Sequence, residues 1–318
     1  MTAPSVAGVR GVLVGQVDAG AGLVRGDALA IPLGDGTVDL VVTSPPYFAL
    51  RSYRDGGEHY DGQIGSEASP TAFLEALWAV TAECWRVLKP GGSLFVNLGD
   101  KYAGSGGHNN AGIAKPHTGG AIKGRSYIDQ AKYEGSRPAQ RRQAPDRYNQ
   151  ASDGIRAKSL MGLPWRYAIG CIDGQADPEG RGWILRSEIV WSKPNGLPES
   201  VKDRVRRSHE QWFHLTKEGT YYSDMDHLRT PHEGRDQVRP EVGVSGMNRG
   251  VAVGKRRITA GGGDIARSPL GALPSSVWTI ATQPLIVPAH VDVDHFAAFP
   301  TEWPRRLILG WSPPGGVV

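Results

Sequence analysis

The hydrophobic pattern near the N-terminal end of the chain changes from a short apolar run to apolar residues at helical spacing. Residues 38–42 form a short β-branched run between Asp35-Gly36 and two prolines, which predicts a buried strand. Ser69 can cap a helix that has Pro70 at its first position. Apolar residues then recur at helical spacing as far as Leu88, so a long amphipathic helix is expected after the strand.

A second apolar run follows this helix. Pro90-Gly91 is expected to end the helix, and residues 93–98 predict another buried strand. A strand, a helix and a strand in this order predict a parallel sheet with helices on its faces, which is the α/β class. Further helices are expected at 164–172 and 301–311, and further strands at 183–191, 210–216 and 277–281.

The most informative segment is Thr43-Ser44-Pro45-Pro46-Tyr47, directly after the first strand. The two prolines fix φ and remove two N–H donors, and Ser44 is held near extended geometry because a proline follows it. The result is a stiff ledge with a hydroxyl, an unpaired carbonyl and an aromatic ring. In open α/β sheets, ligands bind at the carboxyl ends of the strands. A surface turn with a solvent-exposed tyrosine is the simpler alternative.

This ledge suits the methylation of an exocyclic amino group. The lone pair of such a nitrogen is delocalised into the ring, so the nitrogen is a weak nucleophile. Ser44 and the carbonyl of Pro45 could each accept one N–H and direct the lone pair toward a methyl donor. Tyr47 could stack on the flat base.

Residues 43–47 resemble the catalytic motif of the amino-methylating DNA methyltransferases, in the serine form associated with cytosine-N4 enzymes. Adenine-N6 enzymes more often carry Asp or Asn at the position of Ser44. The resemblance continues in the same order at residues 26–29, 88–95, 189–195, 198–204, 209–222 and 295–300. It indicates a permuted, β-class member of the family with a Rossmann-like, S-adenosylmethionine-dependent methyltransferase sheet.

The resemblance implies roles for individual residues. Ser44, Pro45, Pro46 and Tyr47 would be catalytic. S-adenosylmethionine would be bound with the help of five residues, which are Asp27, Thr43, His295, Phe299 and Pro300. A cytosine in double-stranded DNA would be flipped out of the helix and methylated on N4, for restriction-modification or for protection of phage DNA. A cognate restriction endonuclease is a possible partner.

One feature departs from the family pattern. In the permuted order, Gly315-Gly316-Val317-Val318 should lead into a strand and a glycine loop that binds the methyl donor. The sequence stops at Val318, so the sheet is expected to be incomplete at its C-terminal end and the donor-binding fragment to be either missing or encoded separately. Apolar surface around Val42 and Phe95 is expected to be uncovered.

Two polar regions interrupt the fold pattern. Residues 101–160 hold eleven Lys and Arg against four Asp and Glu, with tyrosines between them. This composition fits either phosphate contact with base stacking or a disordered, solvated insert. Residues 226–270 are rich in glycine and lie where the family has its target-recognition segment. Both regions are assigned to DNA contact, through Arg137, Arg141, Arg142, Lys255, Arg256 and Arg257.

The turn after the strand at 183–191 carries two more candidates for DNA contact. Lys193 and Asn195 could touch the base or a phosphate, or could belong to an ordinary polar turn. His209 is interpreted as a packed strand residue rather than a catalytic base. The His-Glu pairs lack the second histidine of a zinc site, so no metal is expected.

These assignments divide the chain into six parts. They are an N-terminal segment (1–23), a catalytic part (24–100), a basic insert (101–160), a continuation of the methyltransferase domain (161–225), a target-recognition insert (226–270) and the start of the cofactor-binding part (271–318).

Composition agrees with a DNA-binding protein of the cytoplasm. The chain has 318 residues and a formal net charge of +4, which is compatible with an anionic partner. Only Cys84 and Cys171 are present, which favours a reducing compartment, and Cys84 lies on an apolar helix face. Neither cysteine is placed as the nucleophile that cytosine-C5 methylation requires. No stretch is long and apolar enough to span a membrane.

Cytosine-N4 methylation is therefore the predicted activity. Adenine-N6 methylation is the alternative within the same class, and an inactive DNA-binding remnant is the alternative outside it.

Overall fold

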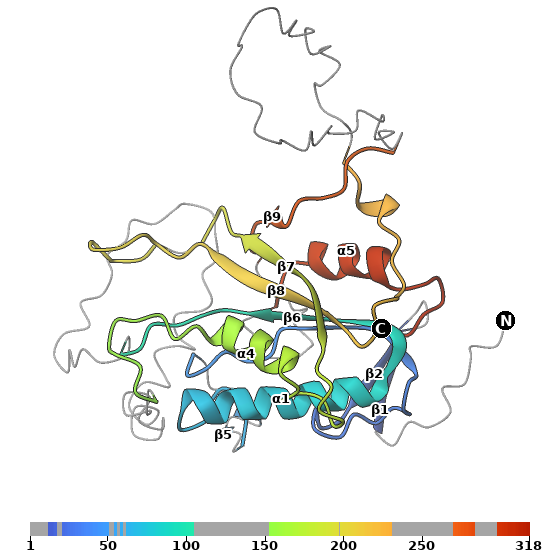
Figure 1. The fold of residues 1–318 in the computed structure, drawn as a ribbon, viewed down its shortest axis with the longest axis horizontal. Coiled ribbons are helices and arrows are strands. Elements are labelled where there is room, and N and C mark those ends of the chain that lie inside the picture. Colours follow the sequence, from blue (N-terminus) through green and yellow to red (C-terminus); the bar gives the residue numbers. More distant parts are fainter. Residues whose placement is uncertain are drawn as a thin grey trace, which may run out of the picture.

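The computed structural model describes residues 12–17, 21–50, 54–55, 58–59, 62–104, 153–196, 198–230, 270–283 and 298–318. Their elements, in chain order, are β1 (Val12–Val17), β2 (Ala21–Arg25), β3 (Val38–Thr43), β4 (Arg54–Asp55), β5 (Glu58–His59), α1 (Pro70–Val87), β6 (Leu88–Leu98), α4 (Leu163–Ile172), β7 (Ile184–Ser192), β8 (His209–Thr216), η1 (Asp226–Leu228), β9 (Val277–Thr279) and α5 (Glu302–Trp311) (Figure 1).

A five-stranded sheet in the order β3-β6-β8-β7-β9 forms the centre of the fold. β3 runs parallel to β6 and β7 runs parallel to β9, whereas β8 is antiparallel to both of its neighbours. The expectation of a parallel sheet is thus correct for β3 and β6 and wrong for β8. The chain returns from β7 to β8 through a surface loop without a crossover helix, which allows only an antiparallel return. The α/β class is confirmed.

The start of α1 agrees with the sequence prediction, but its end does not. The hydroxyl of Ser69 accepts the N–H of Ala72 at 3.2 Å, and Pro70 occupies the first turn. The helix ends at Val87, and β6 begins at once with Leu88 in extended geometry. Pro90 limits how far the helix can continue, because a proline disfavours helical geometry in the residue before it, here Lys89.

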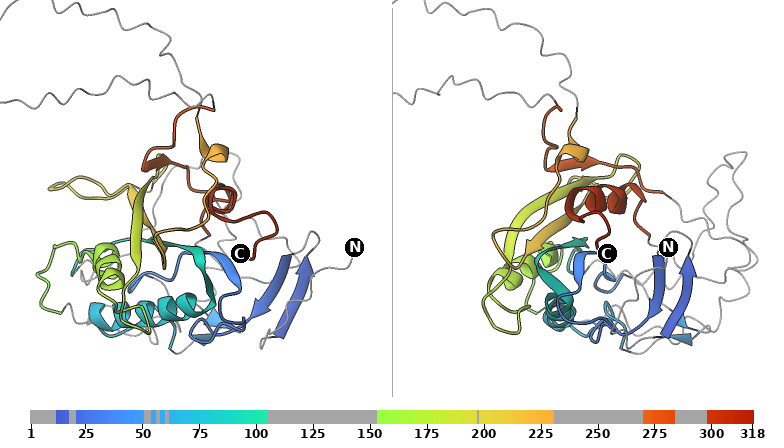
Figure 2. Two further views of the ribbon diagram at one scale, coloured as in Figure 1. Left: turned by 45° about the vertical axis from the view of Figure 1, so that its right-hand side comes forward. Right: turned by 90° about the vertical axis from the view of Figure 1, so that its right-hand side faces the viewer.

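Helices cover both faces of the sheet (Figures 1 and 2). On one face, α1 and α4 pack against Leu94, Val96 and Leu98 of β6 in a continuous apolar core. On the other face, α5 covers a second core rich in tryptophan, with Trp191, Trp212, Trp278, Trp303 and Trp311. Alternate residues of β6 enter opposite cores, as expected for a strand buried on both faces.

Phe95 belongs to this second core, and the expectation that it would be uncovered is wrong. Its side chain is 0% exposed, and its ring lies 4.7 Å from that of Trp311 and 4.3 Å from that of His214, in each case between centroids. Val42 also packs against the tryptophan core. Burial lowers the pKa of His214 to about 3, so this imidazole is neutral and structural at neutral pH.

The N-terminal part of the chain adds two strands to the fold. β1 and β2 pair antiparallel and form a separate two-stranded sheet. His209 is the first residue of β8, which confirms its interpretation as a strand residue. Among the described helices, none combines the length and the apolar character needed to cross a membrane.

Gly170 allows α4 to approach α1 closely, and its replacement by alanine should destabilise the fold. A Cβ at this position would lie 2.1 Å from Cζ2 of Trp78, whose indole N–H also donates to the carbonyl of Tyr167 at 3.1 Å. We expect Gly170→Ala to lower the free energy of unfolding by about 1–3 kcal/mol, because the packed indole must move. Urea unfolding measures this change. Gly219→Ala is the control, since a Cβ at Gly219 would meet nothing within 4 Å, and equal losses in both variants would contradict the packing argument.

Candidate active site

The ledge at residues 44–47 lies at the carboxyl end of β3, next to the carboxyl end of β6. The two strands are parallel, with Thr43 paired to Val96, so the residues after Thr43 meet the last residues of β6. Asn97 is the residue that meets them. Its side chain is 1% exposed, at the end of a strand that is otherwise apolar there.

Asn97 organises the ledge through its amide. The Nδ2 donates to the main-chain carbonyl of Gln211 on β8 at 3.1 Å, which fixes the orientation of the amide. Its Oδ1 therefore faces the ledge, where it accepts from the hydroxyls of Ser44 at 3.2 Å and Tyr47 at 2.8 Å. Three strands thus hold one amide that binds two hydroxyls of the predicted catalytic motif.

This arrangement determines what Ser44 can offer to a ligand. A serine hydroxyl has one proton to donate and two lone pairs to accept with. Since the proton is directed to Asn97, the Oγ of Ser44 is left as a hydrogen-bond acceptor. Within the described part of the chain, the carbonyl oxygen of Pro45 also receives no hydrogen bond. The ledge therefore carries two acceptors on successive residues.

Tyr47 is held by its hydroxyl, its ring and its main chain. Its hydroxyl lies 2.8 Å from Oδ1 of Asn97 and 2.8 Å from Oε2 of Glu210, and the single hydroxyl proton is shared between these two acceptors. A Cβ at Gly99 would lie 2.7 Å from the ring, and one at Gly65 would lie 2.9 Å from the tyrosine carbonyl oxygen. Gly65 also has a φ of +95°, which favours glycine. These two glycines let the backbone lie against Tyr47 and fix its position.

Glu210 connects the ledge to the turn after β7. Its Oε1 accepts a short, charge-assisted hydrogen bond from Nζ of Lys193, and the two side chains are only 17% and 18% exposed. The same ammonium lies 4.1 Å from the centroid of the Trp191 ring. The carboxylate therefore binds Lys193 with one oxygen and Tyr47 with the other.

The two DNA-contact candidates of this turn have partners within the chain. Lys193 pairs with Glu210, as described above. Asn195 donates from Nδ2 to the carbonyl of Thr282 at 3.0 Å and accepts from the N–H of Thr282 at 2.8 Å. This pair of bonds ties the turn after β7 to the segment after β9. A DNA contact of either residue stays a prediction.

The sequence analysis missed the central member of the site, Asn97, and gave Glu210 no role in supporting Tyr47. Asn97 could have been found, because it is the one amide in the apolar run 94–98 and a buried amide needs partners. Glu210 was noted only as part of a resemblance. Its role depends on the antiparallel pairing of β8 with β6, which the sequence pattern did not reveal.

The residues predicted to bind the methyl donor are distributed over several elements. Thr43 ends β3 beside the ledge. Asp27 lies exposed in a turn, where its Oδ1 accepts the N–H of Leu29 at 2.9 Å. Phe299 packs edge-on against Trp212 at 5.5 Å between ring centroids, and Pro300 is buried. A hydroxyl, an exposed carboxylate and a ring suit the polar and aromatic parts of S-adenosylmethionine. The open pocket lined by residues 153–160 and Arg166 contains none of Thr43, Asp27, Phe299 and Pro300.

Several predicted residues lie outside the described part of the chain. They are His295, Arg137, Arg141, Arg142, Lys255, Arg256 and Arg257. Most of the two predicted inserts lies outside it as well. Among the residues that are described, no group of three or more His, Cys, Asp and Glu side chains could hold a metal ion.

Comparison with known proteins identifies relatives over nearly the whole chain. The model of a family described as DNA methylase matches residues 38–318. Type II methyltransferase M.Cfr9I of Citrobacter freundii is 36% identical over 302 residues, covering 94% of this chain and 75% of the relative. Type II methyltransferase M.XycI of Xanthomonas campestris pv. cyanopsidis is 34% identical over 94% of this chain and 75% of its own length. Among solved structures, PvuII DNA methyltransferase (cytosine-N4-specific) matches 92% of this chain and 70% of its own, with a TM-score of 0.46 and 15% identity.

Proposed function

This chain belongs to the DNA methylase family, and on that premise we propose that it methylates the N4 amino group of cytosine in duplex DNA. The observation that supports the proposal best is the hydrogen bond from Ser44 to Asn97. It leaves the Oγ of Ser44 as an acceptor at the end of β3, and the carbonyl of the next residue, Pro45, receives no hydrogen bond from the described residues. An exocyclic amino group has two N–H donors, which match these two acceptors.

The two acceptors would activate the amino nitrogen without covalent chemistry. Each N–H of the bound base would donate to one acceptor, at Oγ of Ser44 and at the carbonyl oxygen of Pro45. The lone pair would then point away from the ledge. Because the prolines and Asn97 fix both acceptors beforehand, little reorganisation is needed at the moment of transfer.

Tyr47 would hold the ring of the base, while Pro46 stiffens the ledge. The amino group of a paired and stacked cytosine cannot reach this site, so the nucleotide must be flipped out at a cost of a few kcal/mol. Stacking on an aromatic side chain offsets part of this cost, by about 1–3 kcal/mol per base. The hydroxyl contacts with Asn97 and Glu210 keep the tyrosine in place for this role.

S-adenosylmethionine is the methyl donor of this family, and it supplies an electrophilic methyl group when bound. We propose that Thr43 and Asp27 contribute a hydroxyl and a carboxylate to its site, with Phe299 and Pro300 nearby and His295 as a further contact. Thr43 immediately precedes Ser44, so the donor would be placed beside the ledge.

Glu210 is assigned as a positioning residue. Its two oxygens already bind Lys193 and Tyr47, so it is not placed to take a proton from the substrate. The methylated amino nitrogen is acidic while it carries its extra proton, and it can release that proton to water. No strong base is required for this step.

Adenine-N6 methylation is the second candidate, since an adenine amino group carries the same two donors. Ser44 favours cytosine, because adenine enzymes of the resembling group more often carry Asp or Asn at this position. The names of the relatives further support a role as the modification enzyme of a type II restriction-modification system. A cognate endonuclease is then the expected partner.

Digestion of methylated DNA to nucleosides tests the proposal. The protein is incubated with duplex DNA and methyl-labelled S-adenosylmethionine, and we expect the label in N4-methylcytosine. Label in N6-methyladenine alone would contradict the assignment to cytosine. A duplex made only of adenine and thymine is the control and should stay unlabelled. No label in any DNA would contradict an activity of this chain alone, and it would fit either an inactive DNA-binding remnant or a donor-binding fragment that is encoded separately.

A further inference from the structure

Two surface segments meet beyond the carboxyl end of β6. One is the loop between β7 and β8, and the other is the segment 153–160 that precedes α4. Nζ of Lys158 lies 3.8 Å from Oδ2 of Asp203, which links the two segments at their surface. Together they carry a set of cations that we name the basic rim, consisting of Arg156, Lys158, Lys202, Arg204, Arg206 and Arg207.

The β7–β8 loop is shaped by its own acidic residue. Oε2 of Glu199 accepts from Nη1 of Arg204 at 2.7 Å, and its Oε1 accepts from the main-chain N–H of Arg207 at 3.3 Å. The guanidinium of Arg204 also lies 3.9 Å from the centroid of the Tyr102 ring, in the segment that follows β6. Glu199 is therefore engaged in fixing the loop, and the one cation of the basic rim with which it forms an ion pair is Arg204.

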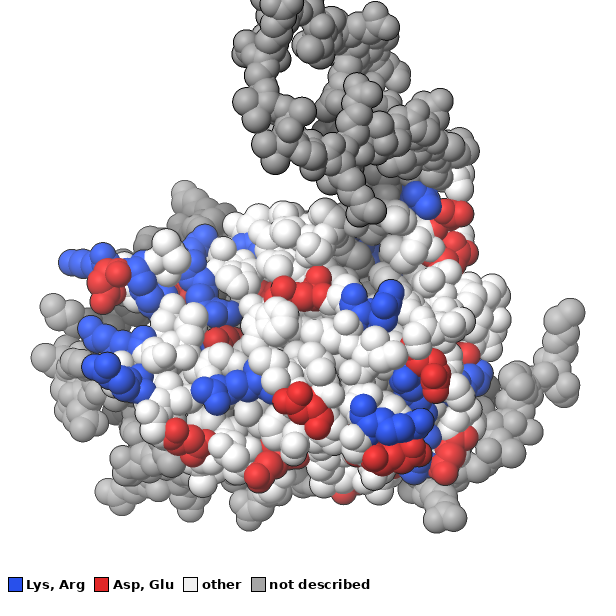
Figure 3. Space-filling view, in the orientation of Figure 1, with Lys and Arg blue, Asp and Glu red and all other residues white. Residues whose placement is uncertain are grey.

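Two cations of the basic rim are free to contact a ligand, whereas Lys158, Arg204 and Arg207 each lie beside a carboxylate. In the part of the chain that is described, the side chains of Arg156 and Lys202 make no hydrogen bond or ion pair, and both residues are exposed. Arg206 is exposed as well and donates only to the carbonyl of Gly196 at 3.1 Å. In Figure 3, Lys and Arg side chains gather at the left of the molecule, over the β7–β8 loop.

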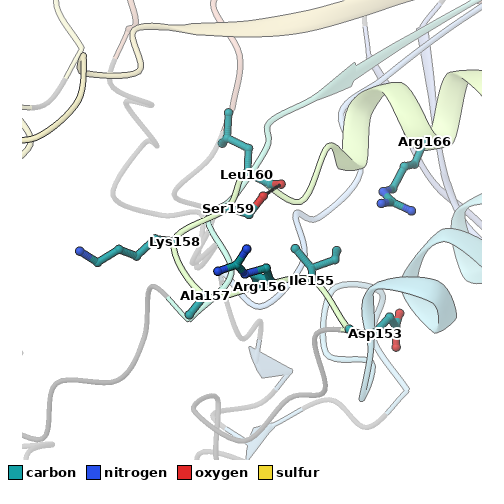
Figure 4. Close-up of a pocket in the computed structure, with 9 residues that line it drawn as sticks. Asp153, Ile155, Arg156, Ala157, Lys158, Ser159, Leu160 and Arg166 are labelled. Atoms are coloured by element: carbon teal, nitrogen blue, oxygen red, sulfur yellow. Dashed lines mark hydrogen bonds between the residues drawn. The ribbon is translucent and has the colours of Figure 1, made fainter.

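The segment 153–160 also lines an open pocket of about 640 Å³. Its lining includes Arg156, Lys158 and Arg166, and its acidic member is Asp153 (Figure 4). The carboxylate of Asp153 accepts the N–H of Thr71 at 2.7 Å. This carboxylate therefore stabilises the start of α1. The pocket is thus a concave surface with an excess of positive charge.

The basic rim begins next to the candidate active site. Arg207 lies three residues before Glu210 on the way into β8, and Asp100 lies three residues after Asn97 on the way out of β6. Nη1 of Arg207 is 3.7 Å from Oδ2 of Asp100, with both side chains mostly buried. This contact anchors the rim to the two strand ends that hold Tyr47.

We propose that the basic rim binds the phosphate backbone of duplex DNA beside the flipped nucleotide. The proposal rests on the proposed function and adds residues that the sequence analysis did not assign to DNA. An enzyme that flips a base must hold the backbone around the vacated position, and unpartnered Lys and Arg side chains are the usual contacts to phosphate. Such contacts position the duplex and carry no sequence preference.

The salt dependence of DNA binding tests the proposal. Each lost phosphate contact lowers the slope of log affinity against log salt by about 0.9. We therefore expect Arg156→Ala/Lys202→Ala to lower the slope by about 1.8 on a duplex of arbitrary sequence, without added methyl donor. The control is Arg181→Ala/Arg305→Ala, which removes the same charge from two side chains that are 61% and 56% exposed in other elements.

The outcomes separate this proposal from the proposed function. An unchanged slope for Arg156→Ala/Lys202→Ala, or an equal loss in the control, would overturn the phosphate assignment. Arg156→Lys/Lys202→Arg keeps both charges and should restore the slope, which excludes a folding defect as the cause. The assay measures DNA binding and needs no catalysis. Its result on the phosphate contacts therefore does not depend on which nucleoside is methylated.

Discussion

Replacing Ser44 by alanine is expected to lower kcat for DNA methylation about 100-fold or more, while DNA affinity changes little. The substitution removes one of the two acceptors for the amino group, and the loss of one preorganised hydrogen bond at a reacting centre costs about 10²–10³ in rate. Single-turnover methylation measures the rate, and fluorescence anisotropy of a labelled duplex measures the affinity.

The control for this variant is Ser275→Ala, which removes an exposed hydroxyl that donates to the carbonyl of Val277 at 3.0 Å. It should leave both quantities unchanged. Equal losses of rate and affinity in Ser44→Ala would show that Ser44 has a structural role rather than a catalytic one.

Breaking the Lys193–Glu210 pair is the second change with a large expected effect. Glu210→Gln leaves the ammonium of Lys193 unpaired where only 18% of its side chain is exposed, and this should lower the free energy of unfolding by about 3 kcal/mol. Lys193→Met should have a similar effect, because it leaves the carboxylate without its cation. The double variant should lose less than the sum of the two single variants. Urea unfolding of the four proteins completes the cycle.

Glu179→Gln is the matched control for this cycle. Glu179 pairs with Arg181 at 2.6 Å, and the two side chains are 59% and 61% exposed. An exposed pair contributes at most about 1 kcal/mol, so this variant should be nearly as stable as the parent. If Glu210→Gln were as mild as Glu179→Gln, the pair could not serve as the support of Tyr47.

Local sequence patterns predicted the elements of the fold well. Ser69 and Pro70 marked the start of α1, and the prolines after Thr43 marked the end of β3. These signals act through the backbone of one or two residues, so they can be read without the tertiary structure. The motif at residues 43–47 was found for the same reason.

Contacts between segments that are distant in the chain could not be predicted from such local sequence signals. The direction of β8 depends on how the chain returns from β7, and the apolar pattern of a buried strand is the same in both directions. The role of Asn97 depends on its contacts with Ser44 and Tyr47, which lie 53 and 50 positions earlier in the chain. The buried pair of Lys193 and Glu210 likewise forms only once β7 and β8 lie side by side.

The close packing of Tyr47 against Gly99 shows the same limit. Glycine at a strand end has several explanations in a sequence, including a turn or simple tolerance of the position. Only the structure shows that a Cβ there would lie 2.7 Å from the tyrosine ring. The candidate site thus combines a motif that the sequence reveals with supports that only tertiary pairing brings together.

A structure of the protein with its target duplex would test the central claim most directly. The account predicts a cytosine flipped out of the helix, with its N4 nitrogen within about 3.2 Å of both Oγ of Ser44 and the carbonyl oxygen of Pro45. The ring of the base should lie against Tyr47. A flipped adenine in this position, or a cytosine whose amino group contacts neither acceptor, would contradict the account.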